Sequence, residues 1–169
     1  NILKMRIPSV LLIGLLLAFS SCKKENEQPQ NNNTGGNLSS IQQGLNNGKT
    51  PLQLFQEGHS LSEIYCNNYA GGIIFYLDTI TGEGLVCTST DIGSNLKWDP
   101  NGSLVGTDLF TYLGCTDTTL WSGSQNTSNV AALRPNSACA IVQNLSDSGY
   151  DDWFLPSKAE ARIMFDVLG

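Results

Sequence analysis

Short apolar patterns along the chain predict helices on both sides of a single β-hairpin. Residues 38–65 carry apolar side chains at helical spacing, and Gly58 is expected to end one helix. Within this stretch Thr50 precedes Pro51, as an N-cap precedes a first helical position, and Ser60 begins a capping box. We therefore expect a helical lead-in to the rest of the chain.

Residues 71–78 are the clearest expected strand. From Ile73 to Leu77 every side chain is β-branched, aromatic or aliphatic, so both faces of the strand are expected to be buried. Turn-forming residues follow, and a second apolar run over residues 84–88 returns along the first. This order predicts a β-hairpin.

Helical spacing returns in the last third of the chain. Residues 126–145 can place their apolar side chains on one side of a helix, which Pro135 is expected to kink or divide. Residues 153–155 predict a short apolar strand. Ser157 then caps a last helix, with Glu160 at its third position.

Between Asp91 and residue 126 the chain has no regular periodicity, yet it contains large aromatic side chains that need a surface to pack on. We therefore expect an ordered, compact loop region rather than disorder. Its aromatic residues are Trp98, Phe110, Tyr112 and Trp121.

The N-terminal segment has the pattern of a secretory signal. Arg6 precedes an apolar run from Val10 to Phe19, and Ser20 and Ser21 lie directly before Cys22. The run is much shorter than the roughly 20 residues of a membrane-spanning helix. The sequence around Cys22 resembles the lipobox of bacterial lipoproteins, although Phe19 is larger than usual; a plain signal peptide or a membrane anchor is the alternative.

This resemblance implies where the protein works. Residues 1–21 would be a leader, with residues 1–4 upstream of the true start at Met5, and Cys22 would carry the diacylglycerol anchor. Lys23 rather than Asp follows the cysteine, which favours an outer-membrane lipoprotein that is open to surface exposure. Residues 22–37 lack large apolar side chains and are expected to be a flexible tether.

Composition and charge narrow the choice of partners. Only 14% of residues are charged and the formal net charge is −6, which argues against nucleic acid as a ligand. With Cys22 lipidated, four cysteines remain, namely Cys66, Cys87, Cys115 and Cys139. They allow three disulfide pairings, among which the sequence cannot choose, and buried thiols are the alternative. Because no CxxC pair exists and His59 is the one histidine, a zinc site is not expected.

Three segments together resemble the DUF1566 or Lcl C-terminal domain, which is close to the Fibrobacter-type paralogous domain of surface proteins. They are residues 69–78, 121–127 and 149–158, and the last, with its Gly-Tyr-Asp-Asp-Trp-Phe-Leu-Pro-Ser-Lys sequence, is the most specific. The family domain would cover residues 66–169. The residues that carry the motif are Gly71, Gly72, Tyr150, Asp152, Trp153, Leu155, Pro156 and Ser157.

The resemblance implies an α+β, C-type-lectin-like fold: a small twisted antiparallel sheet with two helices and long loops. Members of the family continue past the second helix into further strands, often with a WSS-type segment, so we expect this chain to be truncated at its C-terminus. The hairpin would then keep an unpaired edge, and residues 38–169 are expected to fold poorly alone.

Individual residues invite chemical roles that have simpler structural alternatives. Trp153 could stack on a ligand, but the family places it in the core. Asp151 and Asp152 are expected to serve in a turn rather than as a catalytic pair, because neighbours in a strand face opposite ways. Scattered acidic residues could include Ca²⁺ ligands, although no loop has EF-hand spacing; they are Asp78, Asp91, Asp99, Asp108 and Asp117.

The function expected from this resemblance is a non-catalytic binding or adhesion module for a glycan or protein ligand, without a cofactor. A structural or assembly component of the cell envelope is the alternative. The broad fold also contains the formylglycine-generating enzyme, but that activity needs a reactive cysteine pair in the part expected to be missing. His59 has no nucleophile elbow to act with, so we do not expect an enzyme.

Overall fold

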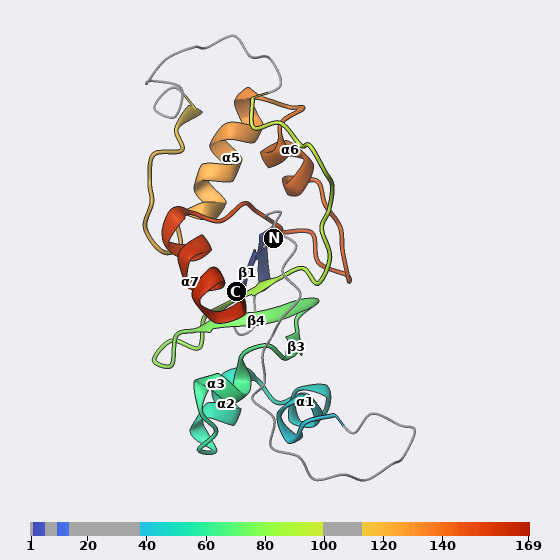
Figure 1. Ribbon diagram of the computed structural model, residues 1–169, viewed down its shortest axis with the longest axis vertical. Coiled ribbons are helices and arrows are strands. Elements are labelled where there is room, and N and C mark those ends of the chain that lie inside the picture. Colours follow the sequence, from blue (N-terminus) through green and yellow to red (C-terminus); the bar gives the residue numbers. More distant parts are fainter. Residues whose placement is uncertain (1, 6–9, 14–37, 100–112) are drawn as a thin grey trace.

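The computed structural model describes residues 2–5, 10–13, 38–99 and 113–169, and its centre is an antiparallel sheet in the order β2-β1-β5-β4-β3 (Figure 1). The hairpin of β4 and β5 pairs Ile74 with Val86, and a register shift between Ile74 and Tyr76 marks a bulge. The strands are β1 (Ile2–Met5), β2 (Val10–Ile13), β3 (Asn68–Tyr69), β4 (Gly72–Leu77) and β5 (Gly84–Cys87).

The expected hairpin is therefore confirmed, and so is the α+β class. β3, β4 and β5 form a small sheet among several helices. β1 pairs with the outer edge of β5, from Leu3 opposite Val86 to Met5 opposite Gly84. Both β1 and β2 fall within the expected leader, so a chain that begins at Cys22 lacks β1 as a partner for β5.

The helical lead-in is confirmed as three short helices: α1 (Ser40–Asn46), α2 (Pro51–Gln56) and α3 (Leu61–Ile64). Thr50 caps α2 as expected, because its hydroxyl accepts the Gln53 N–H and its own N–H donates to Gln53 Oε1 at 2.8 Å. In front of α3, the Ser60 N–H donates to Glu63 Oε2 at 2.8 Å.

Three longer helices follow the sheet: α5 (Gly123–Leu133), α6 (Ala138–Gln143) and α7 (Lys158–Leu168). The division at Pro135 is confirmed, since α5 ends at Leu133 and α6 begins three residues after the proline. A buried ion pair braces this junction, with Arg134 Nε 2.9 Å from Asp99 Oδ1. The Ala138 N–H donates to Lys97 O at 2.8 Å, which ties the start of α6 to the same segment.

The two faces of the hairpin pack against different parts of the molecule. Val86 and Ile74 belong to a large cluster formed with α1, α2, α3, α5 and α6. On the opposite face, Phe75 and Leu85 pack with Phe154 and with apolar side chains of α7. In Figure 1, α7 accordingly lies over the hairpin. The burial of both faces of β4 was predicted from its unbroken apolar run.

The short strand expected over residues 153–155 is present only as a β-bridge at Phe154, outside the named strands of the sheet. The segment is extended, its side chains alternate between the two clusters, and the Leu155 N–H donates to Thr127 of α5. Other expectations lie outside the described residues, among them the lipidation of Cys22, the tether over residues 22–37 and the packing of Phe110 and Tyr112.

Candidate functional site

The second and third motif segments are joined by a buried carboxylate. Glu160, in the first turn of α7, has no exposed surface. Its Oε1 accepts the N–H of Trp121 at 2.8 Å, and its Oε2 accepts the N–H of Ser157 at 2.6 Å. Burial raises the pKa of Glu160, while these hydrogen bonds act in the opposite direction. One side chain thus caps α7 and fixes the loop before α5.

A buried threonine makes a second link between the same segments. The Leu155 N–H donates to Thr127 Oγ1 at 2.8 Å, and that hydroxyl donates back to Leu155 O at 3.2 Å. Gly123, at the start of α5, lies directly against Leu155 and Phe154. Ser157 adds a bond from its hydroxyl to Thr119 O at 2.7 Å. The extended residues 153–155 therefore take α5 as their hydrogen-bonding partner.

The first motif segment joins this framework through aromatic side chains. Tyr76 of β4 meets Trp121 edge to face, with ring centroids 5.6 Å apart. Gly71 has φ +80°, and a Cβ at this position would lie 2.7 Å from the Tyr150 ring. The three segments, which are far apart in the sequence, therefore form one connected framework. Among the motif residues, packing or capping roles are seen for Gly71, Tyr150, Trp153, Leu155 and Ser157.

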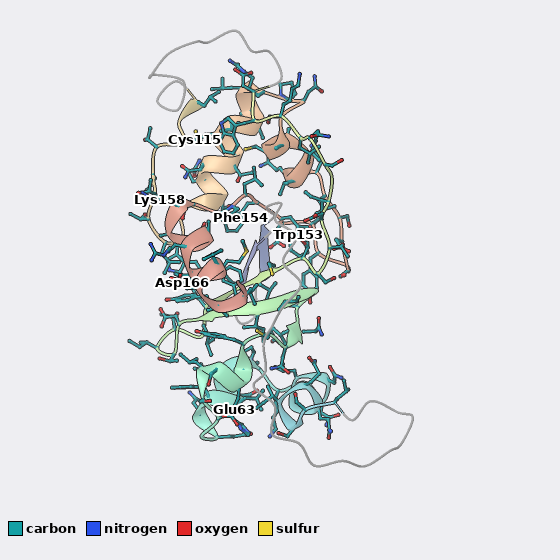
Figure 2. The ribbon with its side chains drawn as sticks, viewed as in Figure 1. Glu63, Cys115, Trp153, Phe154, Lys158 and Asp166 are labelled. Atoms are coloured by element: carbon teal, nitrogen blue, oxygen red, sulfur yellow. The ribbon has the colours of Figure 1, made fainter. Side chains whose placement is uncertain are left out.

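Trp153 is a core residue and not a ligand platform. Its side chain is 1% exposed, and Figure 2 shows it together with Phe154 in the interior. Within the described part of the chain, its Nε1 is buried and has no hydrogen-bond partner. The expected core role is confirmed, and stacking of Trp153 on a ligand from solvent is ruled out by burial.

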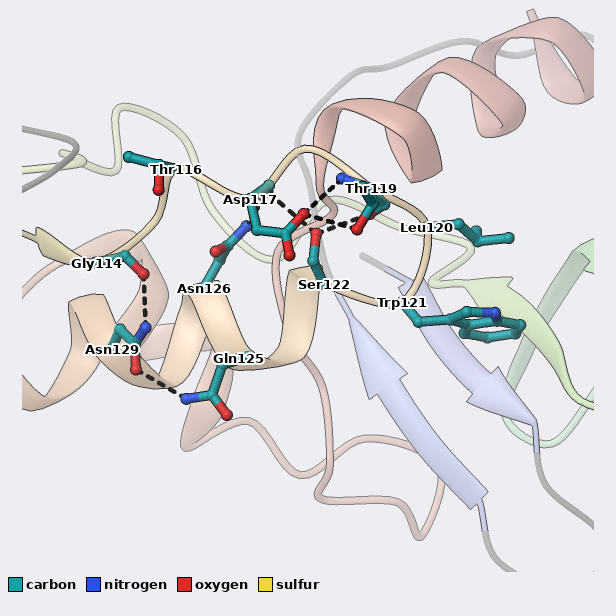
Figure 3. Close-up of a pocket in the computed structure, with 10 residues that line it drawn as sticks. All are labelled: Gly114, Thr116, Asp117, Thr119, Leu120, Trp121, Ser122, Gln125, Asn126 and Asn129. Carbon is teal, nitrogen blue, oxygen red and sulfur yellow. Dashed lines mark hydrogen bonds between the residues drawn. The ribbon is translucent and has the colours of Figure 1, made fainter.

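A hollow beside this framework lies between the loop before α5 and the exposed side of α5 (Figure 3). It is open to solvent and has a volume of about 370 Å³. Amide, hydroxyl and carboxyl groups provide most of its polar lining. The lining residues from α5 are Gln125, Asn126 and Asn129, and those from the loop include Gly114, Thr116, Asp117 and Thr119.

Hydrogen bonds hold the amide groups of the hollow in fixed orientations. Asn129 Nδ2 donates to Gly114 O at 2.6 Å, and Gln125 Nε2 donates to Asn129 Oδ1 at 2.8 Å. Asn126 Nδ2 donates to Asp117 O. Each amide nitrogen is thus used to tie the loop or α5 together. Gln125 and Asn126 both line the hollow, and their amide oxygens are left to accept hydrogen bonds.

Asp117 supplies the charge of the hollow. Its Oδ1 accepts from the hydroxyl of Thr119 at 2.6 Å and from the Thr119 N–H at 2.9 Å. These bonds, the hydroxyl first, lower the pKa of Asp117, so the carboxylate is ionised at neutral pH. The hollow therefore presents fixed oxygen acceptors, one of them anionic, to groups that donate hydrogen bonds.

The indole of Trp121 turns away from these amides. Figure 3 shows it directed toward the strands, where it meets Tyr76. Its backbone has φ +73°, an unusual conformation for a bulky residue. The bond from its N–H to Glu160 holds it there. Trp121 therefore borders the hollow without forming a flat stacking surface inside it.

The structure separates most of the acidic residues considered as Ca²⁺ ligands. Asp78 closes the hairpin turn through the N–H of Ile80 at 2.8 Å, and Asp99 pairs with Arg134. Asp108 lies outside the described residues. In the part of the chain with assigned positions, no group of three or more His, Cys, Asp or Glu side chains is placed to share a metal ion.

His59 and Asp151, two further residues considered for chemistry, lie in different parts of the fold. His59 is half-buried between α2 and α3, with its N–H bonded to Leu54 O at 3.2 Å. Asp151 is exposed in the turn before residue 153.

The described helices include none with the length and hydrophobicity needed to span a membrane.

Asp152 differs from its neighbour because it is partly buried. Burial is the main cause that raises its pKa from 3.8 to about 6, and the nearby Asp151 adds to the effect. Folding therefore favours the protonated form of Asp152. This contribution to stability is present below about pH 4 and is lost as the pH rises through 6.

Asp152→Asn is accordingly expected to be more stable than the parent chain at pH 7, by on the order of 1 kcal/mol once solvent screening is allowed for. The difference should shrink toward pH 4. Urea unfolding at both pH values measures it, and Asp166→Asn on the exposed side of α7 is the control. Equal gains at pH 4 and pH 7 would contradict the titration of Asp152.

Sequence reasoning did not find the hollow. Gln125, Asn126 and Asn129 give only a polar helix face in the sequence, and the loop that faces them has no periodicity. The sequence predicts Glu160 as a capping residue, but its bond to Trp121 spans 39 positions. The sequence does place Ser157 and Glu160 three residues apart at the start of a helix. This pattern predicts the hydrogen bonds between these two residues but not the bond from Glu160 to Trp121.

Comparisons with known proteins add no relative to this description. Neither family models, nor curated proteins, nor solved structures gave a match to the chain.

Proposed function

We propose that this protein is a non-catalytic binding module and that the hollow between Asp117 and α5 takes a hydroxyl-rich ligand of the glycan class. The observation that carries the proposal is the polar lining of the hollow: the amide side chains of Gln125, Asn126 and Asn129, each held by a hydrogen bond, together with the Asp117 carboxylate. Sugar hydroxyls donate hydrogen bonds to acceptors of this kind. A carboxylate acceptor forms stronger bonds than a neutral one.

The rigidity of the surroundings supports the same function. The loop is held by Asn129, and its end is held by Glu160 and Ser157. Groups fixed before a ligand arrives lose little conformational entropy on binding, which is an advantage for a shallow site. An open hollow of about 370 Å³ is large enough for one or two sugar rings.

The resemblance of residues 69–78, 121–127 and 149–158 to the DUF1566 group supports a C-type-lectin-like fold and a role in adhesion. The lipobox-like sequence before Cys22 supports an outer-membrane lipoprotein that holds this domain at the cell surface through a lipid anchor. Both belong to the proposal. The small antiparallel sheet and the interlocked motif segments are compatible with them.

A glycan array probed with the full chain tests the proposal. We expect retention on a subset of glycans and a five- to tenfold weaker affinity for Gln125→Ala and for Asp117→Asn, because each loses one oriented acceptor or its charge. Gln56→Ala and Asp166→Asn, which change the same residue types on other exposed helices, are the matched controls.

Two results would overturn the proposal. One is equal retention of all four variants, which would place the ligand elsewhere. The other is an empty array together with co-purification of envelope proteins with the full chain, which would favour the alternative of a structural or assembly component.

A further inference from the structure

We infer that Cys115 and Cys139 form a disulfide that ties the loop of the hollow to α6. Cys139 is completely buried in the cluster between α5, α6 and the sheet. Cys115 is half-buried and packs against that same cluster from the loop. In the structure both are thiols.

The chain around Cys115 is held against α5, which packs on α6. Leu113 is fully buried in the shared cluster, and Gly114 O accepts the 2.6 Å bond from Asn129 of α5. α5 and α6 are in turn joined by a bond of 3.0 Å from Gln143 Nε2 to Ser128 Oγ. The position of the loop is therefore fixed relative to the helix that carries Cys139.

The two thiols also influence each other electrostatically. Burial raises the pKa of Cys139 to about 12, and the proximity of Cys115 is the next cause. Burial raises the pKa of Cys115 as well.

The sheet excludes a bond between Cys66 and Cys87. The Cys66 N–H donates to Ile74 O on the β3 side of β4, whereas Cys87 pairs with Ile73 on the β5 side. Two strand spacings then separate their Cα atoms by about 9–10 Å. A disulfide requires a Cα separation of roughly 4.4–6.8 Å.

Cys87 is also separated from Cys115 and Cys139. It shares the face of β5 with Leu85 and packs in the cluster under α7, whereas Val86 between them points to the other face. Cys139 and Cys115 lie on the Val86 side. Each of the three ways to join the four cysteines in two disulfides requires a partner for Cys87. The structure therefore favours a single disulfide, between Cys115 and Cys139 in the cluster that they share.

The chemistry is thiol–disulfide exchange with a small-molecule disulfide, such as oxidised glutathione. The thiolate of one cysteine attacks the reagent, forms a mixed disulfide and displaces one glutathione thiolate. The second cysteine loses its proton to solvent and displaces the other glutathione. The two protein thiols give up two electrons in total, and the reagent is reduced to two thiols.

The test is a peptide map of the full chain after equilibration with oxidised and reduced glutathione, followed by alkylation of remaining thiols. One sample starts from the folded chain and a parallel sample starts from the urea-unfolded chain. The second sample ensures that burial of the thiols does not prevent their reaction with glutathione. We expect a Cys115–Cys139 linked peptide from both starting points. Cys66→Ser and Cys87→Ser should retain this link, whereas Cys115→Ser should lose it.

Thermal unfolding provides a second readout. A reductant should lower the melting midpoint of the oxidised parent chain by about 5–10 °C and leave Cys115→Ser unchanged. Alkylation of both Cys115 and Cys139 at equilibrium with excess oxidised glutathione would overturn the inference, and so would a linked peptide that joins either of them to another cysteine.

Discussion

Glu160→Ala is expected to lower the free energy of unfolding by about 3 kcal/mol, because it removes a buried acceptor from two backbone donors at once. The Ser157 N–H loses the bond of 2.6 Å that begins α7, and the Trp121 N–H loses the bond of 2.8 Å that fixes the loop. A cavity also replaces the carboxylate, which has no exposed surface in the parent chain.

Urea unfolding followed by circular dichroism measures this loss. Glu160→Gln keeps the shape and one carbonyl acceptor, so we expect it to lose only about 1 kcal/mol. Glu57→Ala, an exposed glutamate with a surface ion pair to Lys49, is the control and should change stability by less than about 1 kcal/mol. If Glu160→Ala matched Glu57→Ala, the buried carboxylate would not be the link that we describe.

Gly123→Ala is expected to be at least as damaging, at about 3 kcal/mol or more, although alanine is the better helix former. A Cβ at this position would lie 2.7 Å from Leu155 O and 2.7 Å from Phe154 Cε2, with the Glu160 carboxylate also in the way. Backbone and a packed ring cannot move aside as a flexible side chain can. The start of α5 would have to separate from residues 154–155.

Gly44→Ala is the matched substitution, since it also places a methyl group on a helix. Its Cβ would meet the end of the Leu54 side chain at 2.9 Å, which a rotamer change can relieve. We expect a change within about 1 kcal/mol for Gly44→Ala in the same urea assay. Equal effects of the two substitutions would show that Gly123 is not required for the close approach of α5.

Local signals in the sequence predicted much of the fold. The capping residues Thr50, Ser60 and Ser157 each lie at the start of a helix, and Pro135 separates α5 from α6. The hairpin followed from one apolar run, a turn and a second run. These features depend on neighbours within a few residues, which is why the sequence alone contains enough information to predict them.

Features that depend on distant partners could not be predicted in this way. Residues 153–155 have the composition of a strand, but Thr127 offers their backbone a partner 28 positions away. Asp99 appeared as one of several scattered acids, and its buried partner Arg134 is 35 positions away. The hollow likewise arises only when the loop before α5 folds back over the polar side of that helix.

The position of α7 has a consequence for how the chain folds during synthesis. The hairpin face that carries Phe75, Leu85 and Cys87 is covered by Phe154 and by α7, all of which follow it by many residues. Until the ribosome has released that helix, this face of the hairpin lacks its cover. A nascent chain therefore leaves this face of the hairpin exposed until Phe154 and α7 have been synthesised.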